Sequence, residues 1–111
     1  MIEEIIQVAK KASQEIMKIY NSSDFETEYK QDESPITKAD KISHKVIKKC
    51  LTQISNYPIM SEEEIIDYDI RKNWNEFWLV DPLDGTKDFI AKNGEFTINI
   101  ALIKEHKPIL G

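Results

Sequence analysis

The chain has 111 residues, of which 41% are hydrophobic and 32% are charged, and its formal net charge at neutral pH is −5. This length and composition indicate one globular domain, and the negative charge argues against a protein that coats nucleic-acid polymers. A single cysteine, Cys50, excludes an intrachain disulfide and suits a reducing cytoplasm. Because no apolar run is long enough to span a membrane, we expect a cytoplasmic protein, with peripheral contact at the inner membrane as the alternative location.

Amphipathic helices are predicted in the first half of the chain. In residues 2–20, apolar side chains recur at steps of three and four, the spacing of one helix face. After a short exposed strand at 25–30, a second helix is expected, and either Thr37 or Asp40 could cap its start. The apolar side chains expected to face the core are Ile5, Ala9, Ala12, Ile16 and Ile19 in the first helix, and Ile42, Val46, Ile47, Leu51 and Ile54 in the second.

Strand-like stretches follow, and together with the helices they predict an α+β fold. Residues 57–60 form a short apolar run, and 78–80 are large apolar residues typical of a strand covered on both faces. Residues 96–103 alternate as strands do, and 108–111 are expected to begin a partner strand. The segment 67–73 is interpreted as a loop. We therefore expect two helices packed on a mostly antiparallel sheet.

The stretch 78–89 changes abruptly from apolar to acidic. Pro82 has a fixed φ and no N–H to donate, so it predicts the end of the strand. Asp81 and Asp84 flank this proline, and carboxylates that lie so close repel each other unless a cation or proton sits between them. Oxygen ligands favour a hard cation such as Mg²⁺, and a helical turn that begins at Thr86 would offer free N–H groups to a phosphate.

Structural roles explain the same residues equally well from spacing alone. Asp, Pro and Gly are common turn residues, Asp40 suits a helix cap, and Ser61 suits the cap of a helix whose first turn is acidic. A calcium loop fits poorly, because Leu83 and Gly85 stand where that loop needs oxygen ligands. His44 is interpreted as solvated or packed, and a serine or cysteine hydrolase would lack its nucleophile elbow.

The sequence VDPLDGTKDF at 80–89 resembles the signature of the inositol-monophosphatase-like, metal-dependent phosphatases. Inositol phosphatases usually carry Thr-Asn where this chain has Lys87 and Asp88. That pair is similar to the CysQ-type branch, which acts on 3′(2′),5′-bisphosphate nucleotides. SPITKAD at 34–40 resembles the second family signature, and the glutamates that begin at Glu62 resemble a glutamate pair that follows a strand in the family.

The resemblance implies metal-assisted hydrolysis of a phosphate monoester. Asp40 and Thr86 are the implied catalytic residues: the threonine hydroxyl orients the attacking water, and Asp40 holds that hydroxyl. Glu63 is expected just behind the metal ligands. The implied Mg²⁺ ligands are Glu62, Asp81, the Leu83 carbonyl and Asp84. The implied substrate-binding residues are Glu62, Leu83, Asp84, Gly85 and Thr86.

The implied substrate is adenosine 3′(2′),5′-bisphosphate, which would give AMP and phosphate. An inositol or sugar monophosphatase and a non-catalytic remnant with a partial metal site are the alternatives. The expected partner is a small phosphorylated nucleotide, with no nucleic-acid polymer and no membrane span. Residues 1–111 resemble the N-terminal part of the family's layered sugar-phosphatase sandwich, without the half that carries a further metal-binding aspartate. We therefore expect impaired activity, and a sheet edge open to the missing half or to a second copy in a homodimer.

Overall fold

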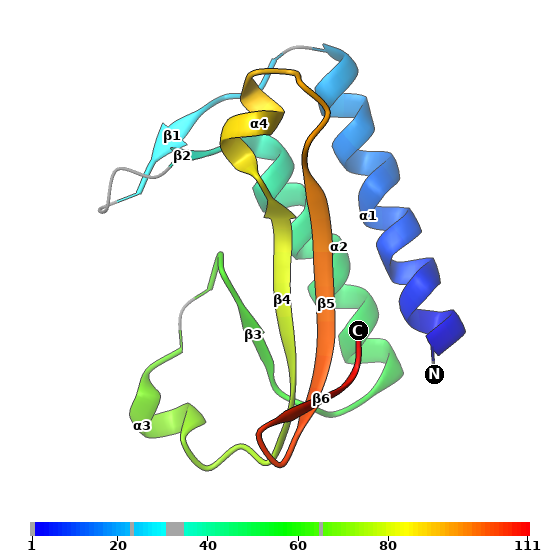
Figure 1. Cartoon of the computed structure of the whole chain (residues 1–111), viewed down its shortest axis with the longest axis vertical. Helices are drawn as coiled ribbons and strands as arrows, with labels where there is room; N and C mark the ends of the chain where they lie inside the picture. The colour runs from blue at the N-terminus through cyan, green and yellow to red at the C-terminus, as the bar shows by residue number, and fades with distance from the viewer. Residues whose placement is uncertain (1, 23, 31–34, 65) are drawn as a thin grey trace.

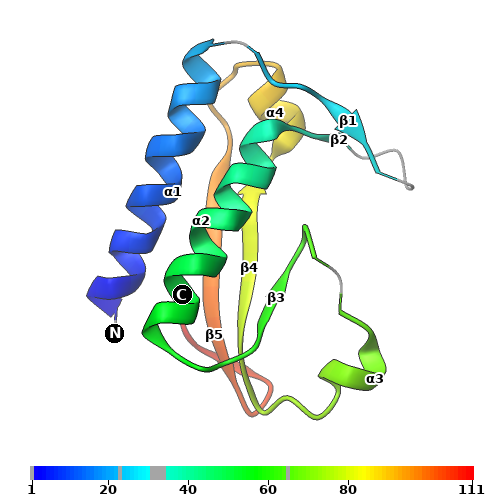
Figure 2. The same cartoon turned by 180° about the vertical axis from the view of Figure 1, so that it is seen from behind.

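The computed structural model describes residues 2–22, 24–30, 35–64 and 66–111. Two long helices lie side by side on one face of a sheet (Figure 1), and the reverse view shows them in front of it (Figure 2). None of the helices in this described part is long and apolar enough to cross a membrane. The elements are α1 (Ile2–Ser22), β1 (Glu28–Tyr29), β2 (Pro35–Ile36), α2 (Lys38–Ile54), β3 (Ile59–Ser61), α3 (Tyr68–Arg71), β4 (Glu76–Asp84), α4 (Thr86–Ile90), β5 (Thr97–Lys104) and β6 (Lys107–Leu110).

The larger sheet has the order β3-β4-β5-β6. Its β4–β5 and β5–β6 pairs are antiparallel and its β3–β4 pair is parallel. The predicted α+β fold with a mostly antiparallel sheet is therefore confirmed, and β3 is the exception. β1 and β2 form a separate antiparallel pair, which covers less of 25–30 than the predicted strand.

The segment 67–73, predicted as a loop, contains the single helical turn α3. The amide of Ile70 donates to the Asp67 carbonyl at 3.0 Å, and the amide of Lys72 donates to the Tyr68 carbonyl at 2.8 Å. No residue of α3 is buried, so the segment lacks the apolar period by which a helix is recognised in a sequence. The loop prediction was wrong for this reason.

The helices α1 and α2 form the core together with β4 and β5. In α1 the predicted face is buried apart from Ala9, which is only half-buried. Val8, which was not predicted, is buried as well. In α2 the buried face includes Asp40 and Ser43, while three of the predicted apolar residues are only half-buried: Ile42, Val46 and Ile54. The face of α2 was partly mispredicted because its polar members are buried with hydrogen-bond partners.

The sequence predicted that the strand ends at Pro82, but β4 continues through Pro82 to Asp84. Asp81 pairs with Asn99 and Asp84 with Thr97, with an irregular register between these pairs. Such an irregularity accommodates a residue that has no N–H to donate. The Pro82 carbonyl accepts a hydrogen bond from Ser43 Oγ at 2.7 Å. The strand therefore carries both aspartates on extended backbone, and α2 holds the irregular segment from behind.

The predicted burial of 78–80 on both faces was also wrong within the described part of the chain. Trp78 and Val80 are buried against the helices, but Leu79, on the opposite face of the sheet, is 43% exposed. Burial on both faces had been expected because residues 78–80 are all large and apolar. Within residues 2–22, 24–30, 35–64 and 66–111, the helices cover one face of the sheet only.

A pair of leucine substitutions tests this one-sided burial. Leu51→Ala removes a fully buried side chain of α2, so we expect it to lower the free energy of unfolding by roughly 2–5 kcal/mol. Leu79→Ala removes an exposed side chain from the other face, and we expect a loss of less than about 1 kcal/mol. Urea unfolding of both variants measures the difference, and equal losses would contradict the described packing.

Candidate functional site

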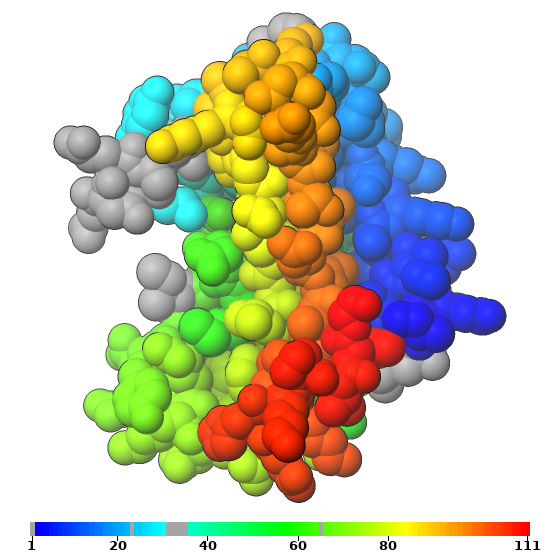
Figure 3. Space-filling view, in the orientation of Figure 1, coloured from blue at the N-terminus to red at the C-terminus, as the bar shows by residue number. Residues whose placement is uncertain are grey.

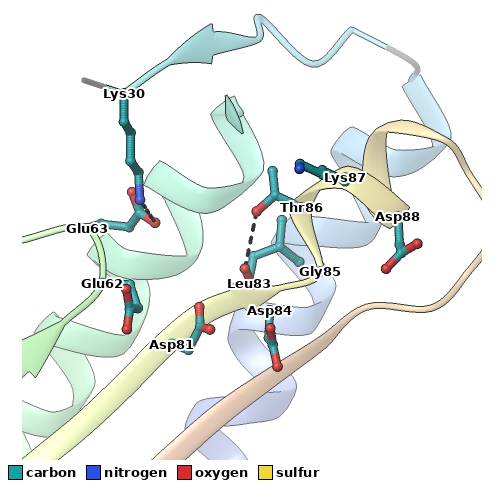
Figure 4. Close-up of a pocket in the computed structure, with 10 residues that line it drawn as sticks. All are labelled: Lys30, Glu62, Glu63, Asp81, Leu83, Asp84, Gly85, Thr86, Lys87 and Asp88. Carbon is teal, nitrogen blue, oxygen red and sulfur yellow. Dashed lines mark hydrogen bonds and ion pairs between the residues drawn. The ribbon is translucent and has the colours of Figure 1, made fainter. Parts of the chain in front are cut away.

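An open pocket of about 340 Å³ lies where the end of β4, the turn after β3 and the segment after β1 meet. The space-filling view shows the molecule hollowed on this side (Figure 3), and the close-up shows the lining side chains (Figure 4). The pocket brings together six of the seven residues predicted for the site, and the seventh, Asp40, lies behind Thr86. The lining residues are Lys30, Glu62, Glu63, Asp81, Leu83, Asp84, Gly85, Thr86, Lys87 and Asp88.

Thr86 and Asp40 form the hydrogen-bonded pair that the resemblance implied. Thr86 Oγ1 donates to Asp40 Oδ1 at 2.9 Å, and the Leu83 carbonyl lies farther away at 3.4 Å. A hydroxyl has one proton and two lone pairs. Because Asp40 takes the proton, the lone pairs of Thr86 are left to accept a hydrogen bond from a molecule in the pocket.

Asp40 serves at the same time in the cap of α2. Thr37 is the N-cap residue, and its backbone N–H and its hydroxyl both donate to Asp40 Oδ2 at 2.7 Å. The side chain is buried, with 1% of its surface exposed. A cap role and a role beside Thr86 had been alternatives, and the geometry supports both at once. Each oxygen of this buried carboxylate has a partner, so its direction is fixed.

Gly85 is required where β4 turns into α4. Its φ is +89°, a conformation that other residues rarely adopt, and an added Cβ would lie 2.8 Å from the Glu95 carbonyl oxygen. The turn places Thr86 at the first position of α4, and the amide of Phe89 donates to the Gly85 carbonyl at 2.9 Å. The predicted helical turn after the acidic motif is confirmed.

The pocket carries a strong excess of negative charge. Five carboxylates line it against two lysine side chains. Partial burial, followed by the charges of Asp84 and Glu62, raises the pKa of Asp81 from 3.8 to about 6. The ionised form of Asp81 is therefore disfavoured unless positive charge enters the pocket.

The carboxylates share a pocket without forming a closed ligand cage. Among the described residues, no group of three or more His, Cys, Asp and Glu side chains is close enough to hold one metal ion. Glu62 and Asp84 are exposed, and Asp84 Oδ2 accepts a hydrogen bond from Asn99 Nδ2 at 3.1 Å. Their side chains have room to rotate towards a cation. Together with the Leu83 carbonyl they supply the oxygen donors that a hard cation prefers, so the ligand roles stay a prediction that fits the donor chemistry.

Ser61 ends strand β3 and does not cap a helix, so that alternative for the acidic run was wrong. Ser61 Oγ lies 2.9 Å from His44 Nδ1 and accepts from the amide of Glu63 at 3.3 Å. His44 Nε2 lies 3.3 Å from Glu64 Oε2. The chain of contacts from serine through histidine to glutamate resembles a catalytic triad in arrangement. Ser61, however, is only 3% exposed. These residues anchor the turn that carries Glu62, and sequence reasoning missed this role of His44.

Lys30 was the other residue missed in the sequence. Its Nζ lies 3.2 Å from Glu63 Oε1, an ion pair that joins residues 33 apart in the chain. Nothing near Lys30 in the sequence distinguishes it from the other lysines. No local pattern signals this contact, which joins the segment after β1 to the turn after β3.

The raised pKa of Asp81 predicts how the stability of the chain depends on pH without divalent cations. A carboxyl whose pKa is higher in the folded chain than in the unfolded chain contributes stability at low pH. That contribution is lost as the pH rises from about 4 through about 6. Asp81→Asn cannot ionise, so we expect it to remove this loss and to raise the melting temperature at pH 7.

Thermal unfolding in EDTA from pH 4 to pH 8 checks this expectation. Asp67→Asn is the matched control, because Asp67 is exposed outside the pocket and its side chain makes no cap hydrogen bond. An Asp81→Asn variant that is less stable than the parent at pH 7 would contradict the charge repulsion described above.

Comparison with known proteins gives one family. The profile described as the Inositol monophosphatase family matches residues 1–111. The chain is 53% identical over 113 residues to the 3'(2'),5'-bisphosphate nucleotidase CysQ of Buchnera aphidicola, which covers 100% of this chain and 43% of that protein. It is 47% identical to the CysQ of Salmonella typhimurium, again over 100% of this chain and 46% of that protein. The chain thus spans less than half the length of these curated relatives.

Solved structures agree with this result. CysQ from Bacteroides thetaiotaomicron, a bacterial member of the inositol monophosphatase family, superposes with a TM-score of 0.82 at 44% identity, covering 97% of this chain and 39% of that one. The extragenic suppressor protein suhB from Bartonella henselae superposes with a TM-score of 0.84 at 25% identity, covering 96% of this chain and 42% of that one. The predicted fold, the N-terminal portion of this layered architecture, is confirmed.

Proposed function

The chain belongs to the inositol monophosphatase family, and from that premise we propose that its pocket is part of the active site of a Mg²⁺-dependent phosphatase. Residues 1–111 would form the N-terminal part of the phosphatase domain, and a complementary segment would supply the rest of the substrate pocket. The observation that carries the proposal is the hydrogen bond from Thr86 to the buried Asp40, at the edge of a pocket lined with carboxylates.

The charge of the pocket supports a requirement for divalent cations. A phosphate ester is an anion, and five carboxylates against two lysines would repel it. Glu62, Asp81, Asp84 and the Leu83 carbonyl would hold the cations, with Asp81 between the other carboxylates. Bound Mg²⁺ supplies Lewis-acid polarisation of the phosphate and a more acidic water.

Thr86 would orient the attacking water through a lone pair. Its own proton is committed to Asp40, so the hydroxyl accepts a hydrogen bond from the water and turns one lone pair of that water towards phosphorus. Asp40 is held by Thr37 and cannot rotate away without breaking the cap of α2. As the water attacks, its proton would pass to Thr86 Oγ1 while the proton of Thr86 passes to Asp40 Oδ1. Positioned proton transfer of this kind contributes typically about 10²–10⁴ in rate. The backbone at Gly85 and the start of α4 would face the phosphate oxygens.

The proposed substrate class is adenosine 3′(2′),5′-bisphosphate, hydrolysed to AMP and phosphate. Support comes from the relatives called 3'(2'),5'-bisphosphate nucleotidases at 53% and 47% identity. Lys87 adds support because it is exposed at the pocket, where an ammonium group suits a substrate with a second phosphate. A nucleotide substrate and a single free cysteine, Cys50, favour the cytoplasm as its location.

Thr86→Val tests the proposed mechanism, because valine keeps the shape of threonine and removes the hydroxyl. Phosphate release from adenosine 3′,5′-bisphosphate is measured with the chain alone and with the C-terminal part of a full-length relative added. With the C-terminal part added, we expect release that requires Mg²⁺, and a loss of about 10²–10⁴ in kcat for Thr86→Val with little change in KM.

Thr97→Val is the matched control, since Thr97 is exposed on β5 outside the pocket, and its activity should equal that of the parent. Inositol monophosphate serves as the competing substrate. Full activity of Thr86→Val would contradict the role given to the hydroxyl. Faster turnover of inositol monophosphate would replace the substrate class and keep the reaction.

A further inference from the structure

Asn93 and Gly94 form the turn that leads from α4 into β5, and neither residue has a role in the proposed function. Both are exposed and lie in irregular backbone, in the segment that crosses the end of the sheet (Figure 1). An asparagine followed by a glycine is a common turn sequence. It is also the pair from which a side-chain amide is most easily lost, because glycine has no Cβ to shield its nitrogen. The turn therefore carries a reactive amide at the surface.

The side chain of Asn93 is folded back along the turn. Its Oδ1 accepts a hydrogen bond from the amide of Glu95 at 3.0 Å, which holds the side-chain carbonyl beside the backbone of the two following residues. The same amide would stabilise negative charge that develops on Oδ1 when a nucleophile attacks the side-chain carbonyl carbon, Cγ. Apart from its chain neighbours, no described atom lies within 4 Å of the position that a Cβ on Gly94 would take. The turn is therefore uncrowded on that side.

The same side chain is bound to Asp88, a residue that lines the pocket. Asn93 Nδ2 donates to Asp88 Oδ1 at 2.8 Å, and the backbone amide of Asn93 donates to the Asp88 carbonyl at 3.3 Å. The close-up shows Asp88 on α4, beside the turn at Gly85 (Figure 4). The Glu95 carbonyl oxygen lies only 2.8 Å from the position of a Cβ added to Gly85. A chemical change at Asn93 would thus reach the Gly85 turn through close contacts.

We propose that Asn93 is a site of spontaneous deamidation, and that the modification weakens the end of the pocket formed by α4. The Gly94 nitrogen gives up its proton to base in the solvent, and its electron pair forms a bond to Asn93 Cγ. The bond from Cγ to Nδ2 breaks, and ammonia leaves with a proton from water. Water then adds to either carbonyl of the resulting cyclic imide and breaks its bond to nitrogen, which gives aspartate or isoaspartate. The net change consumes water, releases ammonia and involves no oxidant or reductant.

Both products disturb the contact with Asp88. In the aspartate product, a carboxylate stands where Nδ2 donated, so the hydrogen bond is lost and two negative charges face each other. In the isoaspartate product, the main chain runs through the former side chain and is longer by one methylene, which displaces the segment that packs on Gly85. The inference concerns the turn itself, so it does not rest on the proposed function.

Incubation of the folded chain in mildly alkaline buffer, followed by peptide mapping with mass spectrometry, tests the modification. We expect the peptide that holds Asn93 to convert to aspartate and isoaspartate, and to convert faster at higher pH. Asn99 is the internal control, because it is also exposed and also donates to a pocket aspartate, Asp84, at 3.1 Å. The branched Ile100 follows it in a paired strand, so its amide should persist. Persistence of the Asn93 amide, or equally fast loss at Asn99, overturns the inference.

Asn93→Asp tests the consequence, because it creates the aspartate product directly. We expect this variant to have a melting temperature several degrees below that of the parent at neutral pH. The matched control is the exchanged pair, Asp88→Asn together with Asn93→Asp, which restores a donor opposite an acceptor and should recover most of the loss. A parent-like melting temperature for Asn93→Asp, or an equal loss in the exchanged pair, contradicts the proposed effect on α4.

Asn93→Gln covers the case in which Asn93→Asp does not fold. Glutamine keeps the amide, but its longer side chain closes a ring far more slowly. After the same incubation, the melting temperature of the parent should fall and that of Asn93→Gln should stay constant. An equal fall in both chains, or no fall in the parent, overturns the inference. None of these measurements uses phosphate release or cation binding, so a failure of the proposed function would leave their outcome unchanged.

Discussion

The hydrogen bond between Thr86 and Asp40 joins parts of the chain that are 46 residues apart, and the geometry of the site follows from it. The first turn of α2 meets the end of β4 at two points, here and where Ser43 donates to the Pro82 carbonyl. The α2 side of both contacts, Asp40 and Ser43, is buried, and a hydrogen bond is electrostatically stronger in such surroundings than in water. The bend that carries the aspartates is thereby fixed against a rigid helix.

A site assembled in this way gathers like charges at one end of a sheet. The raised pKa of Asp81 reflects this crowding, because burial and the neighbouring carboxylates disfavour its ionised form. Proteins accept such local conflicts where a ligand resolves them. The well-packed core of α1, α2, β4 and β5 supplies the stability that the pocket loses.

Local patterns in the sequence were enough to predict the two long helices, the turn at α4 and the acidic motif, since each depends on residues close together in the chain. Apart from the Thr86–Asp40 pair, which the family resemblance implied, contacts between distant residues were not predictable. Pro82 alone indicates the end of a strand, and only its contacts with β5 and Ser43 let the strand continue. The helix α3 has no buried face, so its residues show no helical repeat of apolar side chains. The Lys30–Glu63 pair and the contact of His44 with Ser61 span 33 and 17 residues. No short pattern encodes them.

Asp40 has one oxygen in the cap of α2 and the other on Thr86. A substitution of Asp40 would therefore lower the amount of folded protein as well as the turnover of each folded molecule. Selection for folding alone would thus preserve one member of the pair. The demands of folding and of turnover therefore fall on one and the same carboxylate.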